Sequence, residues 1–213
     1  MQINKVHFPV TALGFGKRVG IWTQGCSIRC PGCVSRDTWT THNQCALGVA
    51  ELVSGIKPWL DQADGVTISG GEPFDQAPAL GELMRLLKSG FPGDVLVYSG
   101  YSFQRLWADF SEVLLHADVV VSEPFLPECG QTLALRGSDN QRIFLLSELA
   151  RSRYPDDIDR QLWEGNRRLD VVVEGDNVWM AGIPRTGDMG RLRDELARCG
   201  YNAQGSDEPL IRT

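Results

Sequence analysis

Residues 19–33 read VGIWTQGCSIRCPGC, a stretch that bears on both the fold and the site. Its first part, Val19–Thr23, predicts a buried β-strand because β-branched and aromatic residues dominate it. The strand leads into Cys26, Cys30 and Cys33, which have the spacing C-x3-C-x2-C. Ligands of α/β sheets lie beyond the carboxyl ends of the strands. A strand that ends in cysteines therefore predicts the edge of the sheet at which a site should lie.

Short β-branched runs alternate with amphipathic stretches along the first two thirds of the chain. Such alternation indicates βαβ units and a mostly parallel sheet. Beyond the first strand, the predicted strands are Val66–Ser69, Val95–Tyr98 and Asp118–Val121, and the predicted helices are Leu47–Leu60, Pro78–Ser89 and one opened by Ser102 that runs through Phe110.

The last third of the chain has a different pattern. Val171–Glu174 and Val178–Met180 flank a Gly-Asp-Asn turn, which predicts a β-hairpin. A closing helix is expected at Met189–Cys199, with Cys199 on its buried face because leucines lie three and seven residues earlier. The predicted fold class is therefore α/β, a mostly parallel sheet with a C-terminal β-hairpin plus helix.

The composition is that of a globular protein rather than of a disordered, fibrous or membrane-spanning chain. The 213 residues are 42% hydrophobic and 23% charged, which predicts a single domain over residues 1–213. No apolar run approaches the roughly 18–20 residues of a membrane helix, and the amino terminus lacks the apolar stretch of a signal peptide. We therefore expect a cytoplasmic protein that does not bind a membrane.

Charge is unevenly distributed along the chain. The net charge of -6 argues against the broad basic surface of a nucleic-acid-binding protein. Residues 1–40 nevertheless carry a balance of +4, which leaves -10 for the remainder. This basic region also holds the three closely spaced cysteines, so it indicates a site for an anionic ligand. A solvated charged surface would have the same composition.

The three closely spaced cysteines have the chemistry of a metal centre. Iron–sulfur clusters take thiolate ligands and normally four of them, so three ligands leave one iron open to a substrate or cofactor. Six cysteines in a cytoplasmic chain do not indicate a disulfide scaffold. The alternatives are a tetrahedral zinc site with Cys45 or His42 as its fourth ligand, and thiols that bind no metal.

A second motif, Gly70-Gly71-Glu72-Pro73, comes directly after the predicted strand Val66–Ser69. Its glycines can bring backbone polar groups close to a ligand. The carboxylate of Glu72 can face a cation such as the ammonium group of an amino acid. Without the cysteines, the same motif would indicate only a tight turn.

C-x3-C-x2-C followed about forty residues later by a strand and GGEP resembles the radical S-adenosylmethionine superfamily. Within it, four segments are similar to anaerobic ribonucleotide reductase activating proteins, which belong with the glycyl-radical activating enzymes. The resemblance is strongest over residues 14–142 and leaves residues 143–213 as a C-terminal extension. The four segments are Ile21–Cys26, Cys30–Cys33, Tyr98–Tyr101 and Arg136–Arg142.

The resemblance implies a partial (β/α) barrel with two cofactors. A reduced [4Fe–4S] cluster would cleave S-adenosyl-L-methionine to a 5′-deoxyadenosyl radical that abstracts a hydrogen atom, and no catalytic side chain beyond the ligands is implied. The implied partners are flavodoxin or ferredoxin as the low-potential electron donor and a glycyl-radical enzyme as the protein substrate. The implied ligands are Cys26, Cys30 and Cys33 for the cluster, and Gly70, Gly71, Glu72 and Ser99 for S-adenosylmethionine.

Two stretches depart from the pattern of the family. Activating enzymes usually carry Asp-Gly-Pro-Gly-x-Arg before the first strand, where Leu13–Arg18 reads LGFGKR. The reductase activators usually carry Asp-Gly-Pro-Phe after the fourth strand, where Ser122–Phe125 reads SEPF. Both stretches are expected where the substrate approaches. The alternatives are therefore a radical enzyme that modifies a peptide or small molecule, and a non-catalytic metal-binding module.

Four further residues are weaker candidates. Arg136 could bind a carboxylate of the substrate or dock a partner, although a surface ion pair would account for it equally. Ser138 and Asn140 could contact substrate or fix a loop. Trp39, close to the cysteines in sequence, could shield a cluster from solvent.

Overall fold

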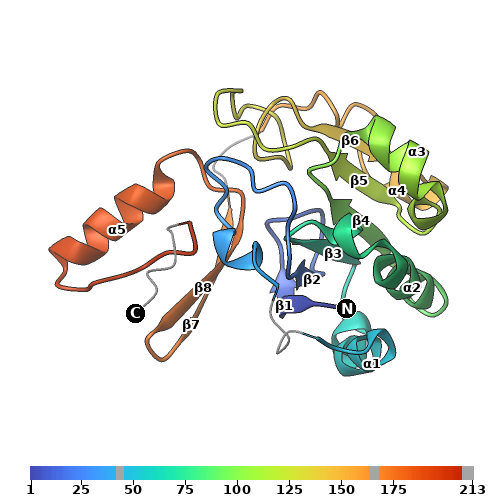
Figure 1. The fold of residues 1–213 in the computed structure, drawn as a ribbon, viewed down its shortest axis with the longest axis horizontal. Helices are drawn as coiled ribbons and strands as arrows, with labels where there is room; N and C mark the ends of the chain where they lie inside the picture. Colours follow the sequence, from blue (N-terminus) through green and yellow to red (C-terminus); the bar gives the residue numbers. More distant parts are fainter. Residues whose placement is uncertain (42–45, 164–167, 208–213) are drawn as a thin grey trace.

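A computed structural model gives the structure of residues 1–41, 46–163 and 168–207. Six strands form one sheet in the order β1-β2-β3-β4-β5-β6, and β7 and β8 form a separate two-stranded sheet (Figure 1). Strands β2 to β5 are parallel, while β1 and β6 pair antiparallel at the two edges. The prediction of an α/β fold with a mostly parallel sheet is confirmed. The strands are β1 (Ile3–Val10), β2 (Arg18–Thr23), β3 (Gly65–Gly70), β4 (Asp94–Tyr98), β5 (Val119–Ser122), β6 (Arg142–Leu145), β7 (Leu169–Glu174) and β8 (Asn177–Gly182).

Three helices connect the parallel strands. The helices α1 and α2 contact each other, as do α2 and α3, so the three form a layer beside the sheet (Figure 1). None of the helices in the described ranges is long and apolar enough to cross a membrane. The helices are α1 (Val49–Leu60), α2 (Ala77–Lys88), α3 (Phe103–Leu114), α4 (Glu148–Arg153) and α5 (Asp188–Arg198).

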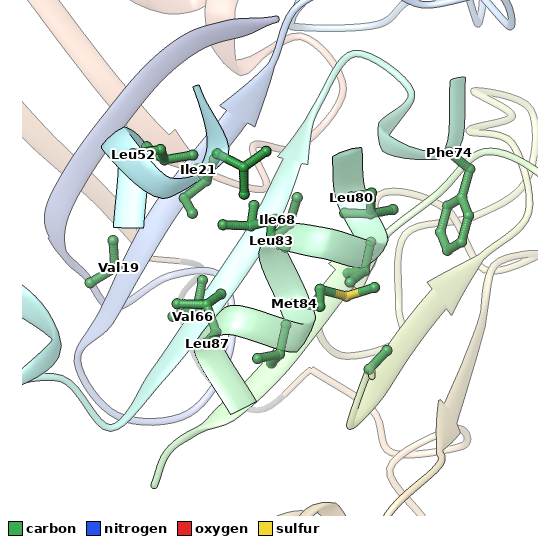
Figure 2. Close-up of a cluster of buried hydrophobic side chains, with 14 of the residues drawn as sticks. Val19, Ile21, Leu52, Val66, Ile68, Phe74, Leu80, Leu83, Met84 and Leu87 are labelled. Carbon is green, nitrogen blue, oxygen red and sulfur yellow. The ribbon is translucent and has the colours of Figure 1, made fainter. Parts of the chain in front are cut away.

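The main hydrophobic core lies between this helix layer and one face of the sheet. Figure 2 shows aliphatic side chains of β2 and β3 meeting those of α1 and α2. Close packing of this kind makes the sheet a rigid support for the loops that follow its strands. The labelled core residues are Val19, Ile21, Leu52, Val66, Ile68, Phe74, Leu80, Leu83, Met84 and Leu87.

The other face of the sheet is covered by the segments that flank β6. Leu96 and Val121 of the sheet belong to a buried cluster with Leu135, Tyr154 and Ile158. Strands buried on both faces are continuous hydrophobic runs, which is why β3, β4 and β5 are recognisable in the sequence.

The C-terminal hairpin and helix are present, with one correction to their packing. The strands β7 and β8 pair antiparallel as predicted, and α5 begins one residue earlier than expected. Within the described chain, no residue of α5 is buried, and Cys199 is exposed. The prediction that Cys199 packs on a buried face is therefore wrong, because the apolar stripe of α5 lies against no core.

Candidate functional site

The carboxyl ends of β2, β3, β4 and β5 lie at one edge of the sheet, because these strands are parallel neighbours. The segments that leave this edge contain the cysteines, the GGEP motif and Ser99. The cysteines and GGEP thus each follow a strand, as predicted, and the structure makes these strands neighbours. The segments are Gln24–Cys33 after β2, Gly71–Pro73 after β3, Ser99–Tyr101 after β4 and Glu123–Pro124 after β5.

The two glycines of GGEP allow a close approach between the chain after β3 and the chain after β2. The amide of Gly71 donates to the carbonyl of Thr23 at 2.9 Å, and the amide of Glu72 donates to that of Gly25 at 2.9 Å. A Cβ at Gly71 would lie 2.0 Å from the Gly25 oxygen, and Gly70 has φ +102°. Only glycine fits both positions, so this motif joins the cysteine segment (Gln24–Cys33) to β3.

Glu72 is buried at the centre of this edge. Its Oε1 accepts from the Phe74 amide at 3.0 Å and from Ser99 Oγ at 2.8 Å, and its Oε2 accepts from the Gly100 amide at 2.8 Å. Burial raises the pKa of the Glu72 carboxyl to about 7, although these donors oppose the rise. In this structure Glu72 and Ser99 bind each other, and their binding of S-adenosylmethionine stays a prediction.

A polar cluster holds the first part of the cysteine segment from outside. Asp75 Oδ2 accepts from the Ser27 amide at 2.7 Å, and Asp75 Oδ1 accepts from Ser27 Oγ at 2.9 Å and from the Tyr101 hydroxyl at 2.5 Å. The Arg105 guanidinium lies 3.7 Å from the centre of the Tyr101 ring, a cation–π contact. The cluster connects the segments after β2, β3 and β4.

The three thiols lie in a tightly folded segment. The Cys33 amide donates to the Cys30 carbonyl at 3.2 Å, and the backbone of Arg29 has φ +53°. Burial raises the pKa of Cys26, Cys30 and Cys33. Repulsion from neighbouring thiols adds to the rise for Cys26 and Cys30. Three ionised thiols at this spacing need a compensating positive charge, which an iron–sulfur cluster supplies.

The described residues contain no group of three His, Cys, Asp or Glu side chains that could hold one metal ion. A [4Fe–4S] cluster differs from a single ion because each thiolate binds a different iron. Its ligands therefore lie farther apart than the ligands of one metal ion. The zinc alternative depends on Cys45 or His42, both of which lie outside the described residues. The donor set, three thiols within eight residues of one folded segment, fits an iron–sulfur cluster.

Arg136, Ser138 and Asn140 lie inside the loop that follows β5. Arg136 is fully buried, and its Nη1 donates to the Gln141 carbonyl at 2.6 Å. Ser138 Oγ accepts from the Leu126 amide at 3.1 Å, and Asn140 Nδ2 donates to a main-chain carbonyl of the same loop at 2.8 Å. These contacts correspond to the loop-fixing alternative for Ser138 and Asn140, and they place Arg136 away from the surface.

The two departures from the family pattern lie at opposite ends of the sheet. Leu13–Arg18 ends at the first residue of β2, so it lies at the amino ends of the parallel strands, and the prediction that it lies where substrate approaches is wrong. Its Arg18 is buried and bonds Asp94 at 2.7 Å. Glu123 follows β5 at the carboxyl edge and has φ +81°, a conformation that favours glycine.

Sequence reasoning missed Ser27, Asp75 and Tyr101 as parts of this site. Ser27 and Tyr101 lie inside quoted motifs, but their types and spacing carry no signal of a shared hydrogen bond. Asp75 lies three residues beyond Glu72, where an acidic residue also suits the first turn of a helix. Only the folded chain brings these three polar side chains together.

Comparison with known proteins supplies the family. Residues 12–144 match the family described as 4Fe-4S single cluster domain, which is more than half of the chain. The chain belongs to this family. It is 31% identical over 137 residues to the anaerobic ribonucleoside-triphosphate reductase-activating protein of Enterobacteria phage T4, covering 62% of this chain and 85% of that protein. The corresponding protein of Escherichia coli K12 is 27% identical over 145 residues, covering 64% of this chain and 94% of that protein.

One further relative matches over about half of its length, and one solved structure aligns with part of the chain. Pyruvate formate-lyase-activating enzyme of Clostridium pasteurianum is 32% identical over 129 residues, which are 57% of this chain and about half, 52%, of that enzyme. The crystal structure of QueE from Escherichia coli aligns with a TM-score of 0.41 and 20% identity, covering 55% of this chain and 68% of that one.

The reductase-activating proteins and the lyase-activating enzyme confirm the resemblance drawn from the motifs. As a member of the 4Fe-4S single cluster domain family related to activating enzymes, the chain is an enzyme of the radical S-adenosylmethionine class. Its cofactors are a [4Fe–4S] cluster and S-adenosylmethionine. The binding residues for these cofactors are proposed below.

Proposed function

We propose that this protein activates a glycyl-radical enzyme of the anaerobic ribonucleotide reductase type by abstracting a hydrogen atom from it. In this proposal residues 1–213 act in the cytoplasm as one domain, a partial (β/α) barrel, without nucleic acid or membrane as partner. Flavodoxin or ferredoxin would donate the electron. The proposed ligands are Cys26, Cys30 and Cys33 for the cluster, and Gly70, Gly71, Glu72 and Ser99 for S-adenosylmethionine.

The observation that carries the proposal is the joining of the cysteine segment and GGEP at one edge of the sheet. Thr23 and Gly25 accept the amides of Gly71 and Glu72, so the two motifs cannot move independently. When bound and reduced, the cluster supplies the electron that cleaves S-adenosylmethionine to its 5′-deoxyadenosyl radical. The chain supplies the fixed distance between thiolates and the Gly70–Glu72 segment.

Glu72 has a defined task in this proposal. The ammonium group of a bound amino acid would favour its ionised form, because an opposite charge lowers the pKa of a buried carboxyl. The carboxylate already holds Ser99 and the Gly100 amide, so a ligand that charges it also orders the segment after β4. Glu72 would thus orient the cofactor and connect two of the strand ends.

The structure of the two departures is compatible with a reductase-type target. Leu13–Arg18 lies at the opposite end of the strands, so its differences do not bear on the substrate. At Glu123, the backbone keeps a positive φ in place of the usual glycine. Glu123 thus has a backbone conformation that favours glycine, at the position where the family pattern carries one.

The test is transfer of a radical to a protein. Reconstituted enzyme, reductant and S-adenosylmethionine would be mixed anaerobically with a glycyl-radical ribonucleotide reductase, and the glycyl radical counted by electron paramagnetic resonance. We expect a radical from the wild type but none from Cys33→Ala. The control is Cys199→Ala, which removes an exposed thiol directly after α5 and should give the wild-type radical.

Each other outcome contradicts a stated part of the proposal. Formation of 5′-deoxyadenosine without a glycyl radical would overturn the target and favour a peptide or small-molecule substrate. A full complement of iron in Cys33→Ala would overturn the ligand set. Absence of any cluster in the wild type would leave a non-catalytic module as the function.

A further inference from the structure

The β7–β8 hairpin has two faces, and its inner face packs against the first two strands of the main sheet. Ala181 of β8 is buried in a cluster that includes the last residue of β1. The Trp179 ring lies 5.1 Å from the ring of Trp22 in an edge-on contact. On β7, Asp170 Oδ2 accepts from the Thr11 amide at 2.6 Å. These contacts fix the position of the hairpin, although it forms a sheet of its own (Figure 1).

The outer face of the hairpin is aliphatic and exposed. Residues that pair directly across an antiparallel ladder lie on the same face. Val173 pairs with Val178, and their side chains are 67% and 54% exposed. Every position of β7 and β8 on this side holds an apolar residue. We define the hairpin face as the four side chains of this side that are exposed in the part of the chain that the structure describes: Leu169, Val171, Val173 and Val178.

The hairpin is attached to two of the segments that build the candidate site. The chain that leaves β8 meets the loop after β5, where the Thr186 amide donates to Gln131 Oε1 at 2.8 Å and Gln131 Nε2 donates to the Pro184 carbonyl at 3.4 Å. The second attachment is the contact of the inner face with Trp22, which lies four residues before Cys26. A partner on the hairpin face would therefore lie next to the carboxyl edge of the sheet.

The size of the hairpin face favours a transient partner. Its four side chains expose about 300 Å² of aliphatic surface, the size of patches that mark interaction sites on monomeric proteins. A stable complex buries roughly 800 Å² on each partner, so the face is too small to hold a permanent dimer by itself. A protein substrate fits this size, because it must bind and then leave after each turnover.

We propose that the hairpin face is a docking surface for the protein substrate, the glycyl-radical enzyme, which presents an apolar segment to it. The inference rests on the proposed function, because it takes the substrate to be a protein. Burial of the aliphatic side chains stabilises the complex. The attachments of the hairpin through Gln131 and Trp22 then hold the bound substrate beside the carboxyl edge.

The measurement is the rate of glycyl-radical formation at increasing concentrations of reductase, followed by electron paramagnetic resonance. Val173→Lys places a charge in the hairpin face at a position that is open to water in the free enzyme. We expect its KM for reductase to rise about tenfold with kcat within about twofold of the wild type, because docking precedes the chemical step. The matched control is Leu115→Lys, whose side chain is 73% exposed directly after α3, and it should keep the wild-type KM.

A wild-type KM in Val173→Lys, with a full complement of iron, would overturn the inference. A second measurement does not need a variant. In the wild type, amides of residues 169–182 should exchange hydrogen more slowly when reductase is present. Those of α1, which packs on the other face of the main sheet, should keep their rate. Unchanged exchange across the hairpin at a saturating concentration of reductase also overturns the inference.

A second copy of this chain is the competing occupant of the hairpin face. Light scattering that shows a dimer for the wild type and a monomer for Val173→Lys would assign the face to that copy and overturn the inference. Failure of the proposed function has a different signature, since the wild type would then form no glycyl radical at any concentration of reductase. If the wild type forms the radical while Val173→Lys keeps the wild-type KM, only the role of the hairpin face is wrong.

Discussion

Glu72 illustrates how one side chain joins the site to the stability of the fold. Its carboxyl is 1% exposed, and burial raises its pKa to about 7. Three donors of the chain itself surround it, and none of them carries a positive charge. The sequence indicates a carboxylate that faces a cation, but it does not indicate that Ser99 would bind that carboxylate. Long-range hydrogen bonds of this kind depend on the register of neighbouring strands, which spacing along the chain does not specify.

The raised pKa predicts how the stability of the cluster-free protein depends on pH. Between pH 4.5 and 7 the folded Glu72 carboxyl keeps a proton that the unfolded chain releases, so Glu72 costs stability as pH rises through this window. Glu72→Gln cannot titrate. We expect the difference in unfolding free energy between wild type and variant to change by about 3 kcal/mol between pH 5 and pH 8, in favour of the variant at high pH. Urea unfolding at both pH values measures it.

The control for this measurement is Glu82→Gln, an exposed position on α2. The difference in unfolding free energy between this variant and the wild type should be the same at both pH values. If the difference in unfolding free energy between wild type and Glu72→Gln is the same at pH 5 and pH 8, the carboxyl of Glu72 is already ionised at pH 5 in the folded protein.

Glu123 gives a prediction about backbone conformation. At φ +81° a side chain with a Cβ costs about 1–2 kcal/mol. Glu123 also accepts from the Phe103 amide at 3.0 Å, a bond that both Glu123→Ala and Glu123→Gly remove. We therefore expect the glycine variant to be more stable than the alanine variant by about 1 kcal/mol in urea unfolding. This reverses the usual order, in which alanine is the more stable of the two. Equal stability of the two would mean that the positive φ carries no cost.

At the scale of elements, the sequence predicts the buried parallel strands well and the edges of the sheet poorly. Strands β3 and β5 are β-branched runs buried on both faces, so their composition alone indicates them. Strand β1, which no pattern indicates, is buried only at its two ends and contains Pro9, a residue that demotes a strand prediction. Strand β6 is four residues long. Edge strands depend on a partner for their existence, and no window of sequence contains that partner.

The amino ends of the parallel strands are held by a buried ion pair, and its removal should weaken the whole sheet. Arg18 Nη2 bonds Asp94 Oδ2 at 2.7 Å, and Arg18 Nε donates to Thr67 Oγ at 2.6 Å, so one guanidinium joins β2, β3 and β4. Asp94→Asn leaves this buried charge without its counterion. We expect a loss of about 3–5 kcal/mol in urea unfolding.

The matched control for the buried pair is Asp109→Asn, which breaks the exposed pair with Arg105. It should cost less than about 1 kcal/mol. A similar loss in both variants would mean that burial does not strengthen the Arg18–Asp94 interaction.

At the scale of the whole molecule, the cysteine segment is held from two directions. The parallel sheet holds its start through Gly25, while the C-terminal region holds its end. The Arg36 amide donates to the Ser206 carbonyl at 3.0 Å, and Ser206 Oγ donates to the Val34 carbonyl at 2.8 Å. The first attachment joins two motifs that the sequence places at strand ends. They do not predict the second, because residues 34 and 206 meet only through the path of the extension.

The extension should therefore order the chain after Cys33 without contributing to the core. Arg193 of α5 bonds both oxygens of Asp207 at 2.7 and 2.8 Å, which anchors the segment that reaches Arg36. Since α5 buries no residue in the described chain, Arg193→Ala should leave the free energy of unfolding within about 0.5 kcal/mol of the wild type. Hydrogen exchange at the Arg36 amide should become faster, because its acceptor is released.

Mass spectrometry of peptides that span residues 33–39 measures this exchange. The matched variant is Arg191→Ala, which removes an arginine that pairs with Asp188 inside the same helix and should leave exchange unchanged. If both variants exchange at the wild-type rate, Arg193 does not anchor the C-terminal segment. If both exchange faster, the helix as a whole is responsible rather than the contact with Asp207.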